Sequence, residues 1–423
     1  PLPAILFFFP FLAALLCAMV GWFGKNIPRA LAVLALAGMT VLSFQALEAT
    51  FTADEGKLRI FMGGWAPPLG IEWSLDRFGA LIVALVSVVS FATVAGSGAA
   101  VRKELPHSET SYYALLLLLV SGLIGMVTTG DLFNVFVHLE VASLSAYALV
   151  ACGGRGAPRA ALRYLILGSL GASLYLLGVG FLYAATGTLN MADTARLLAA
   201  GANPRLVQVG TALIVAGLGV KMGLFPLHSW MPDAYSRAPA ASAALMAPLV
   251  TKVGAFVLMR VLFWVYGVSL LKNEQAVLQV LSWAGALAVV AGGVLAFMQE
   301  DLRRMLAYSS VSQVGIVALG IGLANPSSVT GAMLHIINDA LMKGALFLAA
   351  GVMATRFDIH KISDLPRLRG RAPWTGAAFA VAGMSLVGIP PLCGFYGKWY
   401  VLMGALNAGR PALAVLLALG SLI

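Results

Sequence analysis

Apolar runs of about twenty residues recur along the whole chain, separated by short stretches that carry charges, glycine and proline. A run of this length lets an α-helix cross the hydrocarbon core of a bilayer. The pattern predicts twelve full spans and a shorter apolar run at 411–423. We place the spans at 2–24, 29–47, 78–99, 112–129, 131–151, 162–186, 206–225, 240–265, 277–298, 304–324, 328–354 and 373–404.

These spans indicate one all-α polytopic membrane domain over 1–423. The first run is long for the apolar core of a cleaved signal, so we interpret it as a spanning helix. The last run has thirteen residues, which is too short to cross, and we therefore expect the sequence to be truncated at one or both ends. The longest connection, 48–77, contains Trp65, Trp73 and two adjacent prolines, which is typical of an interfacial loop.

Two of the spans contain prolines that should break the helix. The seventh is interrupted at Pro226, shortly after Lys221, and the twelfth at Pro390–Pro391, shortly before Lys398. Broken spans in corresponding positions are typical of inverted structural repeats with ion sites at the breaks. We therefore expect N-terminal helices over 1–106, a first five-helix repeat over 112–270 and a second repeat over 275–423.

Composition agrees with a membrane protein, since 60% of the residues are hydrophobic and 10% are charged, with a mean hydropathy of +0.92. The net charge of +10 does not indicate nucleic-acid binding here, because basic residues collect in cytoplasmic loops. Loops after odd-numbered spans, which include Lys25, hold 15 basic residues. Loops after even-numbered spans, which include Arg260 and Lys272, hold 8. Because the loops richer in basic residues face the cytoplasm, the excess after odd-numbered spans places the N-terminus outside.

Motifs for bound cofactors are missing from the sequence. Cys17, Cys152 and Cys393 are scattered and form no CxxC pair, so an iron–sulfur or structural zinc site is not expected. No GxxxxGK followed by Ser or Thr is found either. We expect no cofactor, no metal and no redox chemistry within this chain.

The two loop counts leave over four basic residues, Lys221, Lys252, Lys343 and Lys398, and these lie within predicted spans, as does Glu140. Each such charge costs about 2.5–3.5 kcal/mol on insertion scales. Burial weakens the proton affinity of a lysine amine, whereas an arginine stays charged. The choice of lysine at all four positions favours proton handling, although buried ion pairs that only fix helix packing remain the alternative.

The eleventh span carries His335, Asp339 and Lys343 at i, i+4 and i+8, with Asn338 beside them. A helix places the three on one face. Such a stripe would suit a hydrated proton path. The alternative is a short polar seam that packs against another helix.

Besides Asp339 of this stripe, three further residues are secondary candidates. His138 lies two positions before Glu140, so the two point to nearly opposite sides of the helix, and an interhelical hydrogen bond is favoured over a relay role. His228 and Asp233 lie at the break of the seventh span, where capping and gating are equally compatible with the pattern.

Several motifs resemble the proton-conducting antiporter-like subunits. This family includes the D subunit of Mrp cation/proton antiporters, the antiporter-like subunits of respiratory complex I, and counterparts in membrane-bound hydrogenases. The resemblance rests on GDLFNVFVHLEVASLSAYAL, GVKMGLFPLHSWMPDAYSRAPAASAALMAPLVTKVGAF, SSVSQVGIVALG, HIINDALMKGALFLAAG and GIPPLCGFYGKW.

The resemblance implies about 13–14 helices in the full protein, with two inverted five-helix repeats. It also implies a hydrophilic axis along the membrane midplane, joined to water by half-channels. Glu140 of the fifth helix would pair with Lys221 of the seventh, and Lys252 would be the bridging residue of the eighth. His335 and Lys343 would belong to a broken eleventh helix and Lys398 to the twelfth. The motifs GDLFN…E and HxxxDxxxKxxLF resemble the branch of the Mrp D subunits and the hydrogenases more than the quinone-site end of complex I.

The expected function is that of a proton-translocating subunit within a multisubunit complex of a bacterial or archaeal cell membrane. The D subunit of an Mrp-type Na⁺ or K⁺/proton antiporter is the first reading. A proton-pumping subunit of an NADH:quinone oxidoreductase or a membrane-bound hydrogenase is the alternative. Two further hypotheses come from other classes of protein: a standalone solute transporter, and a redox enzyme in its own right. Expected partners are other membrane subunits, protons with Na⁺ or K⁺, and lipid, but no nucleic acid.

Overall fold

The computed structural model describes residues 2–21, 24, 26–271 and 275–422. Lys25 and Lys272 of the charge count, the end of the first predicted span at 22–23 and the last residue of the final apolar run lie outside the described residues.

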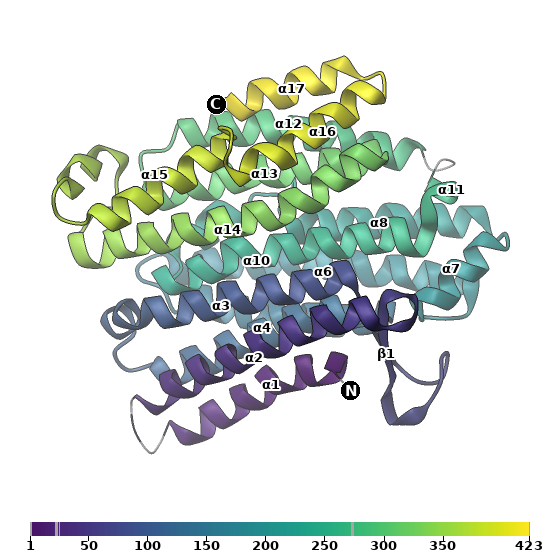
Figure 1. Cartoon of the computed structure of the whole chain (residues 1–423), viewed down its shortest axis with the longest axis horizontal. Coiled ribbons are helices and arrows are strands. Elements are labelled where there is room, and N and C mark those ends of the chain that lie inside the picture. The colour runs from purple at the N-terminus through teal and green to yellow at the C-terminus, as the bar shows by residue number, and fades with distance from the viewer. Residues whose placement is uncertain (1, 22–23, 25, 272–274, 423) are drawn as a thin grey trace.

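Long helices that run side by side along one direction make up most of the described chain (Figure 1). Eleven helices among the described residues are long and apolar enough to cross a membrane, and they confirm the first eleven predicted spans. They are α1 Leu2–Val20, α2 Ile27–Thr52, α3 Arg77–Glu104, α4 Glu109–Thr128, α5 Leu132–Ala151, α6 Ala157–Thr186, α8 Pro204–Met222, α10 Ala240–Met259 with its π-helical extension Arg260–Tyr266, α12 Gln275–Phe297, α13 Leu302–Leu323 and α14 Pro326–Phe357.

The twelfth predicted span is two half-helices, α15 Pro373–Val387 and α16 Cys393–Asn407, which follow one another across the molecule (Figure 1). The seventh span is likewise divided into α8 and the short α9 Met231–Arg237. Both breaks predicted from the prolines are therefore present. The remaining short helices are α7 Met191–Ala199, α11 Gly267–Leu271 and α17 Pro411–Leu422.

The two breaks share a local design. Each begins with a glycine in the left-handed region, Gly223 with φ of 71° and Gly388 with φ of 93°, and each has a proline three residues later. A left-handed glycine ends a helix without a steric cost, and the proline prevents its immediate resumption.

The expectation of a broken eleventh helix is wrong, because α14 is continuous over 32 residues. The stretch from His335 to Lys343 contains no proline or glycine that would interrupt it.

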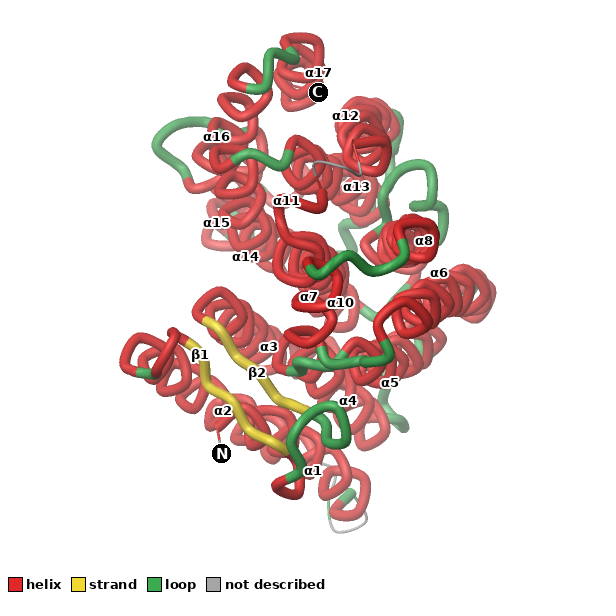
Figure 2. Tube along the Cα trace, turned by 90° about the vertical axis from the view of Figure 1, so that its right-hand side faces the viewer, coloured by secondary structure: helices red, strands yellow, loops and turns green. Residues whose placement is uncertain are grey.

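The connection predicted as an interfacial loop contains a β-hairpin. Strand β1 Lys57–Phe61 pairs antiparallel with β2 Glu72–Asp76, with Lys57 opposite Asp76 and Phe61 opposite Glu72. The hairpin lies across the ends of the first helices (Figure 2). Trp73 of β2 is buried there and forms an isolated bridge with Thr129. Within the described residues, this hairpin is the single sheet of an otherwise mainly helical fold, and it caps one end of the helices.

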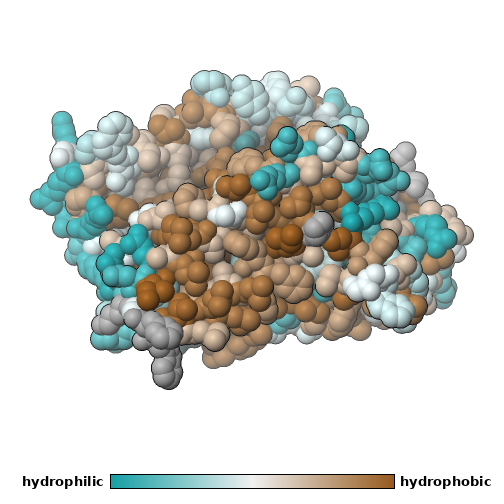
Figure 3. Space-filling view, turned by 60° about the horizontal axis from the view of Figure 1, so that its bottom comes forward, coloured by the Kyte–Doolittle hydropathy of each residue, from teal (hydrophilic) through white to brown (hydrophobic). Residues whose placement is uncertain are grey.

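The surface has the polarity that a bilayer requires. A wide apolar belt crosses the face shown in Figure 3, and hydrophilic residues gather at the two ends of the helices. Large exposed side chains such as Leu34, Val41 and Leu170 belong to spanning helices. An apolar belt of this kind indicates contact with lipid.

Candidate functional site

The first buried ion pair joins α5 to the end of α8. Lys221 Nζ lies 3.7 Å from Glu140 Oε1 and donates hydrogen bonds to Ser143 Oγ at 2.8 Å and Tyr147 OH at 3.3 Å. The Lys221 side chain is 7% exposed and the Glu140 side chain 27%. Lys221 belongs to the last turn of α8, where unpaired carbonyls favour a positive charge. The proton on Lys221 is therefore held by one carboxylate and two hydroxyl groups.

Ser143 and Tyr147 were not identified from the sequence. With Glu140 they occupy positions i, i+3 and i+7 of α5, so all three lie on one helical face towards α8. The same spacing argument that found the stripe in the eleventh span could have found them.

The second ion pair joins α10 to α14 and is fully enclosed. Lys252 Nζ lies 2.5 Å from Asp339 Oδ2, with side-chain exposures of 4% and 0%. The same ammonium group donates to Ala247 O at 3.0 Å. Asp339 was only a secondary candidate, yet the structure makes it the carboxylate partner of Lys252. Two opposite charges in this position neutralise each other where neither could be solvated alone.

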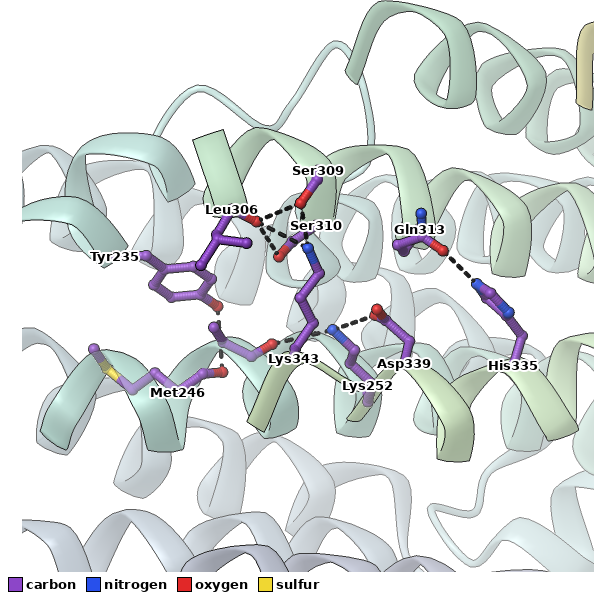
Figure 4. Close-up of polar contacts among 11 residues, drawn as sticks. Tyr235, Met246, Lys252, Leu306, Ser309, Ser310, Gln313, His335, Asp339 and Lys343 are labelled. Carbon is purple, nitrogen blue, oxygen red and sulfur yellow. Dashed lines mark hydrogen bonds and ion pairs between the residues drawn. The ribbon is translucent and has the colours of Figure 1, made fainter. Parts of the chain in front are cut away.

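The stripe on α14 packs between α10 and α13 (Figure 4). Lys343 Nζ donates to Leu306 O of α13 at 2.9 Å and also to Ser309 Oγ. His335 Nε2 lies 3.0 Å from Gln313 Oε1, whereas its Nδ1 is buried without a hydrogen-bond partner among the described residues. The stripe therefore contacts α10 through Asp339 and α13 through Lys343 and His335.

Lys398 of α16 reaches back to the half-helix before it. Its Nζ donates to Leu386 O at 2.7 Å and Val387 O at 3.1 Å, the carbonyls that end α15. These carbonyls lack intrahelical partners and carry partial negative charge. Both broken spans therefore place a lysine at the carbonyl end of their first half.

A cavity of about 460 Å³ leads towards this second group of lysines. Its lining includes Ser309, Gln313, Leu386 and Val387, which are hydrogen-bond partners of Lys343, His335 and Lys398. The exposed residue Glu300 lines it as well. The cavity therefore borders the hydrogen-bond partners of Lys343, His335 and Lys398.

The remaining candidates lie elsewhere. His138 Nδ1 lies 2.7 Å from Asn134 O of its own helix, so the expected interhelical hydrogen bond is wrong. Its ring instead packs edge-on against Phe7 and Trp73, at centroid distances of 4.5 and 5.4 Å. This places His138 towards α1 and the hairpin, away from Lys221.

His228 and Asp233 do not cap α9, and no capping hydrogen bond from either side chain is found within the described part of the chain. The His228 ring stacks on Phe225 at 5.3 Å. Asp233 forms ion pairs with Arg163 at 3.0 Å and Arg304 at 3.7 Å, and so links α6 to α13.

Arg260 was counted as a loop residue, but the structure buries it inside a span. Its Nη2 lies 3.1 Å from Asp76 Oδ2, and its Nη1 donates to Val127 O. Asp76 also caps α3 by accepting a hydrogen bond from Gly79 N at 2.6 Å. Arg260 therefore anchors the hairpin to the π-helical end of α10. Among the described residues it joins Lys221, Lys252, Lys343 and Lys398 as a fifth buried basic residue.

Spanning helices, two of them broken, that enclose a row of buried lysine and carboxylate side chains define a membrane protein of the antiporter-like class. Residues 129–423 match the family model described as NADH:quinone oxidoreductase/Mrp antiporter, transmembrane region. The chain belongs to this family.

Similar proteins carry names from both branches of the family. The chain is 44% identical to the N subunit of the NADH-quinone oxidoreductase of Desulforudis audaxviator, over 92% of this chain and 77% of that protein. It is 32% identical to the D subunit of the Na⁺/H⁺ antiporter of Bacillus subtilis, over 90% and 76%. A solved chain of the membrane-bound sulfane sulfur reductase, an archaeal respiratory membrane complex, superimposes with a TM-score of 0.92 at 34% identity, covering 99% of this chain and 85% of that one. These matches support both branches and do not separate them.

Proposed function

We propose that this chain is a proton-translocating subunit of a multisubunit membrane complex. The observation that carries the proposal is the sequence of buried ionisable groups from Glu140 and Lys221, through Lys252 and Asp339, to Lys398. Ionisable groups at membrane depth are costly and mark ion pathways. The printed names of the relatives, which are subunits of an antiporter and of an oxidoreductase, support the same reading.

The proposed mechanism is electrostatic. Glu140 stabilises the protonated form of Lys221, and separation of the pair lowers the proton affinity of the amine. The proton then moves towards Lys252, which lies beside the carboxylate of Asp339.

From this centre the proposed path continues along α14 through Lys343 and His335 to Lys398. The cavity beside Ser309 and Gln313 supplies water to this part of the path. Exit of the proton resets the Glu140–Lys221 pair. Lysine suits each step because it can release a proton that arginine would keep.

The repeat organisation belongs to the same proposal. The shared Gly-x-x-Pro design at 223–226 and 388–391, with a lysine at each, supports inverted repeats over 112–270 and 275–423 after N-terminal helices over 1–106. By the distribution of basic residues, the N-terminus faces outwards from a bacterial or archaeal cell membrane.

Two complexes fit the proposal. One is an Mrp-type Na⁺ or K⁺/proton antiporter, in which this chain would take the place of the D subunit. The other is a redox-driven complex of the NADH:quinone oxidoreductase type or a membrane-bound hydrogenase, and the names of the relatives support both complexes without separating them. Identification of the co-purifying subunits separates them, because flavin, nickel or iron–sulfur subunits would be present only in the second.

The test is Lys221→Ala in the assembled complex, reconstituted into vesicles that contain a pH-sensitive dye. Proton movement should be abolished while the complex remains intact by gel filtration. Lys361→Ala, which removes an exposed lysine, is the matched control and should move protons at the unaltered rate. Retained proton movement in Lys221→Ala would contradict the proposal.

A further inference from the structure

We propose that an arginine-lined site at one end of α6 binds the phosphate of an anionic phospholipid. Two cavities of about 390 and 290 Å³ lie there, where α6, α9 and α13 meet, and they share Arg155 and Arg237. The larger cavity is also lined by Arg159, Arg163 and Asp233. None of these arginines belongs to the proposed proton path.

The site carries positive charge that the protein does not neutralise. Asp233 is the one carboxylate that lines the larger cavity, and Arg163 and Arg304 already engage it. Within the described residues, Arg155, Arg159 and Arg237 have no ion pair. A surplus of exposed positive charge around a cavity favours an anionic ligand.

The smaller cavity repeats this imbalance. Arg303 and Arg304 line it together with Asp301, whose carboxylate accepts the backbone N–H of Arg304 as a helix cap. The Nε of Arg304 is buried and has no hydrogen-bond partner in the part of the chain that the structure describes. A buried N–H of a charged group without an acceptor is costly, and a ligand oxygen would satisfy it.

The side-chain types point to phosphate. Every Lys or Arg that lines the two cavities is an arginine, whereas the four cations of the proposed proton path are all lysine. A guanidinium group binds phosphate through two parallel hydrogen bonds and does not give up its proton. The first turns of α6 and α13, which begin at Ala157 and Leu302, add the partial positive charge of their helix dipoles.

The surface next to the site favours a lipid over free phosphate. Beyond Arg159 and Arg163, the same outer face of α6 continues with Leu162, Ile166 and Leu170, which are 56%, 58% and 52% exposed. Figure 2 shows α6 at the edge of the bundle. A headgroup in the arginine site would therefore place its acyl chains along an apolar helix face, and basic pockets at this depth suit acidic lipids.

The experiment measures binding of radiolabelled dioleoylphosphatidylglycerol to the purified, assembled complex in detergent. The test variant is Arg155→Gln/Arg159→Gln/Arg237→Gln. The control is Arg367→Gln/Arg369→Gln/Arg371→Gln, which removes three charges from the same end of the helices, in the 358–372 connection. Unlabelled phosphatidylcholine and glycerol phosphate serve as competitors.

We expect one saturable site for the labelled lipid. Its dissociation constant should rise about a hundredfold in the test variant, since each basic residue near an anionic lipid changes the affinity roughly fivefold. The control should bind as the unaltered complex does, and neither competitor should displace the label. A second variant, Leu162→Ser/Ile166→Ser, keeps all the arginines and should also weaken binding.

Three results would overturn the proposal. Equal binding by the test and control variants would mean that the arginines are not the site. Displacement by glycerol phosphate, with no effect of the Leu162→Ser/Ile166→Ser variant, would assign the site to a free phosphate. Absence of saturable binding to the intact complex, with an acidic segment of another subunit cross-linking to Arg159→Cys, would assign it to a protein partner.

Discussion

Lys252 Nζ and Asp339 Oδ2 lie 2.5 Å apart in the enclosed interior, and this ion pair ties α10 to α14. The two residues are far apart in the sequence. Beside them, Lys343 is turned to α13, where it is held by a carbonyl and a hydroxyl oxygen. The centre of the molecule therefore combines one neutralised charge pair with a second lysine that has only uncharged partners.

The first prediction concerns this pair. Asp339→Asn should lower the free energy of unfolding by about 3–5 kcal/mol, because it leaves the charge of Lys252 buried without a counter-charge. The double variant Asp339→Asn/Lys252→Met should recover most of that loss, since no buried charge remains. Thermal unfolding of the purified complex, compared across a double-mutant cycle, measures both effects. Additive losses from the two substitutions would show that the pair is not coupled.

The second prediction separates proton exchange from static pairing at Lys221. Lys221→Arg keeps a positive charge beside Glu140, so it should lower the free energy of unfolding less than Lys221→Ala, which leaves that carboxylate without a counter-charge. Proton movement in vesicles should nevertheless be lost, because arginine does not release its proton. Normal proton movement in this variant would leave the pair with a structural role only.

The third prediction compares two buried histidines under the same substitution. His335→Phe removes both ring nitrogens, including the unpartnered Nδ1, and should slow proton movement at least about tenfold. His138→Phe should leave the rate unchanged, because His138 already packs among Phe7 and Trp73. Stopped-flow acidification of vesicles gives both rates. If the two variants behave alike, His335 does not carry protons.

The fourth prediction concerns the break before Lys398. Gly388→Ala should cost about 1–2 kcal/mol, because φ of 93° is strained for a residue with a Cβ. The added Cβ would also come 3.2 Å from Lys398 Cδ, so proton movement should fall as well. Gly383→Ala in the same half-helix is the control: its Cβ meets nothing within 4 Å, and it should be neutral or stabilising. A stable, fully active Gly388→Ala protein would mean that the left-handed turn is dispensable.

Much of the architecture followed from local pattern. The eleven long spans, the breaks near Pro226 and Pro390, and the single face shared by His335, Asp339 and Lys343 depend on hydropathy, helix breakers and a period of 3.6 residues. The hairpin at 57–76 was missed because two five-residue strands give a weak signal beside prolines and tryptophans that suit a loop equally well.

The order of amino acids was enough to predict which residues lie within the membrane and which of them share a helix face. Their partners became visible only once the helices were packed together: Asp339 for Lys252, the α15 carbonyls for Lys398, and Asp76 for the buried Arg260. The physical reason is that hydropathy and helical period fix depth and direction along one helix. The choice of a counter-charge depends on how helices far apart in the chain pack side by side, and no local pattern encodes that packing.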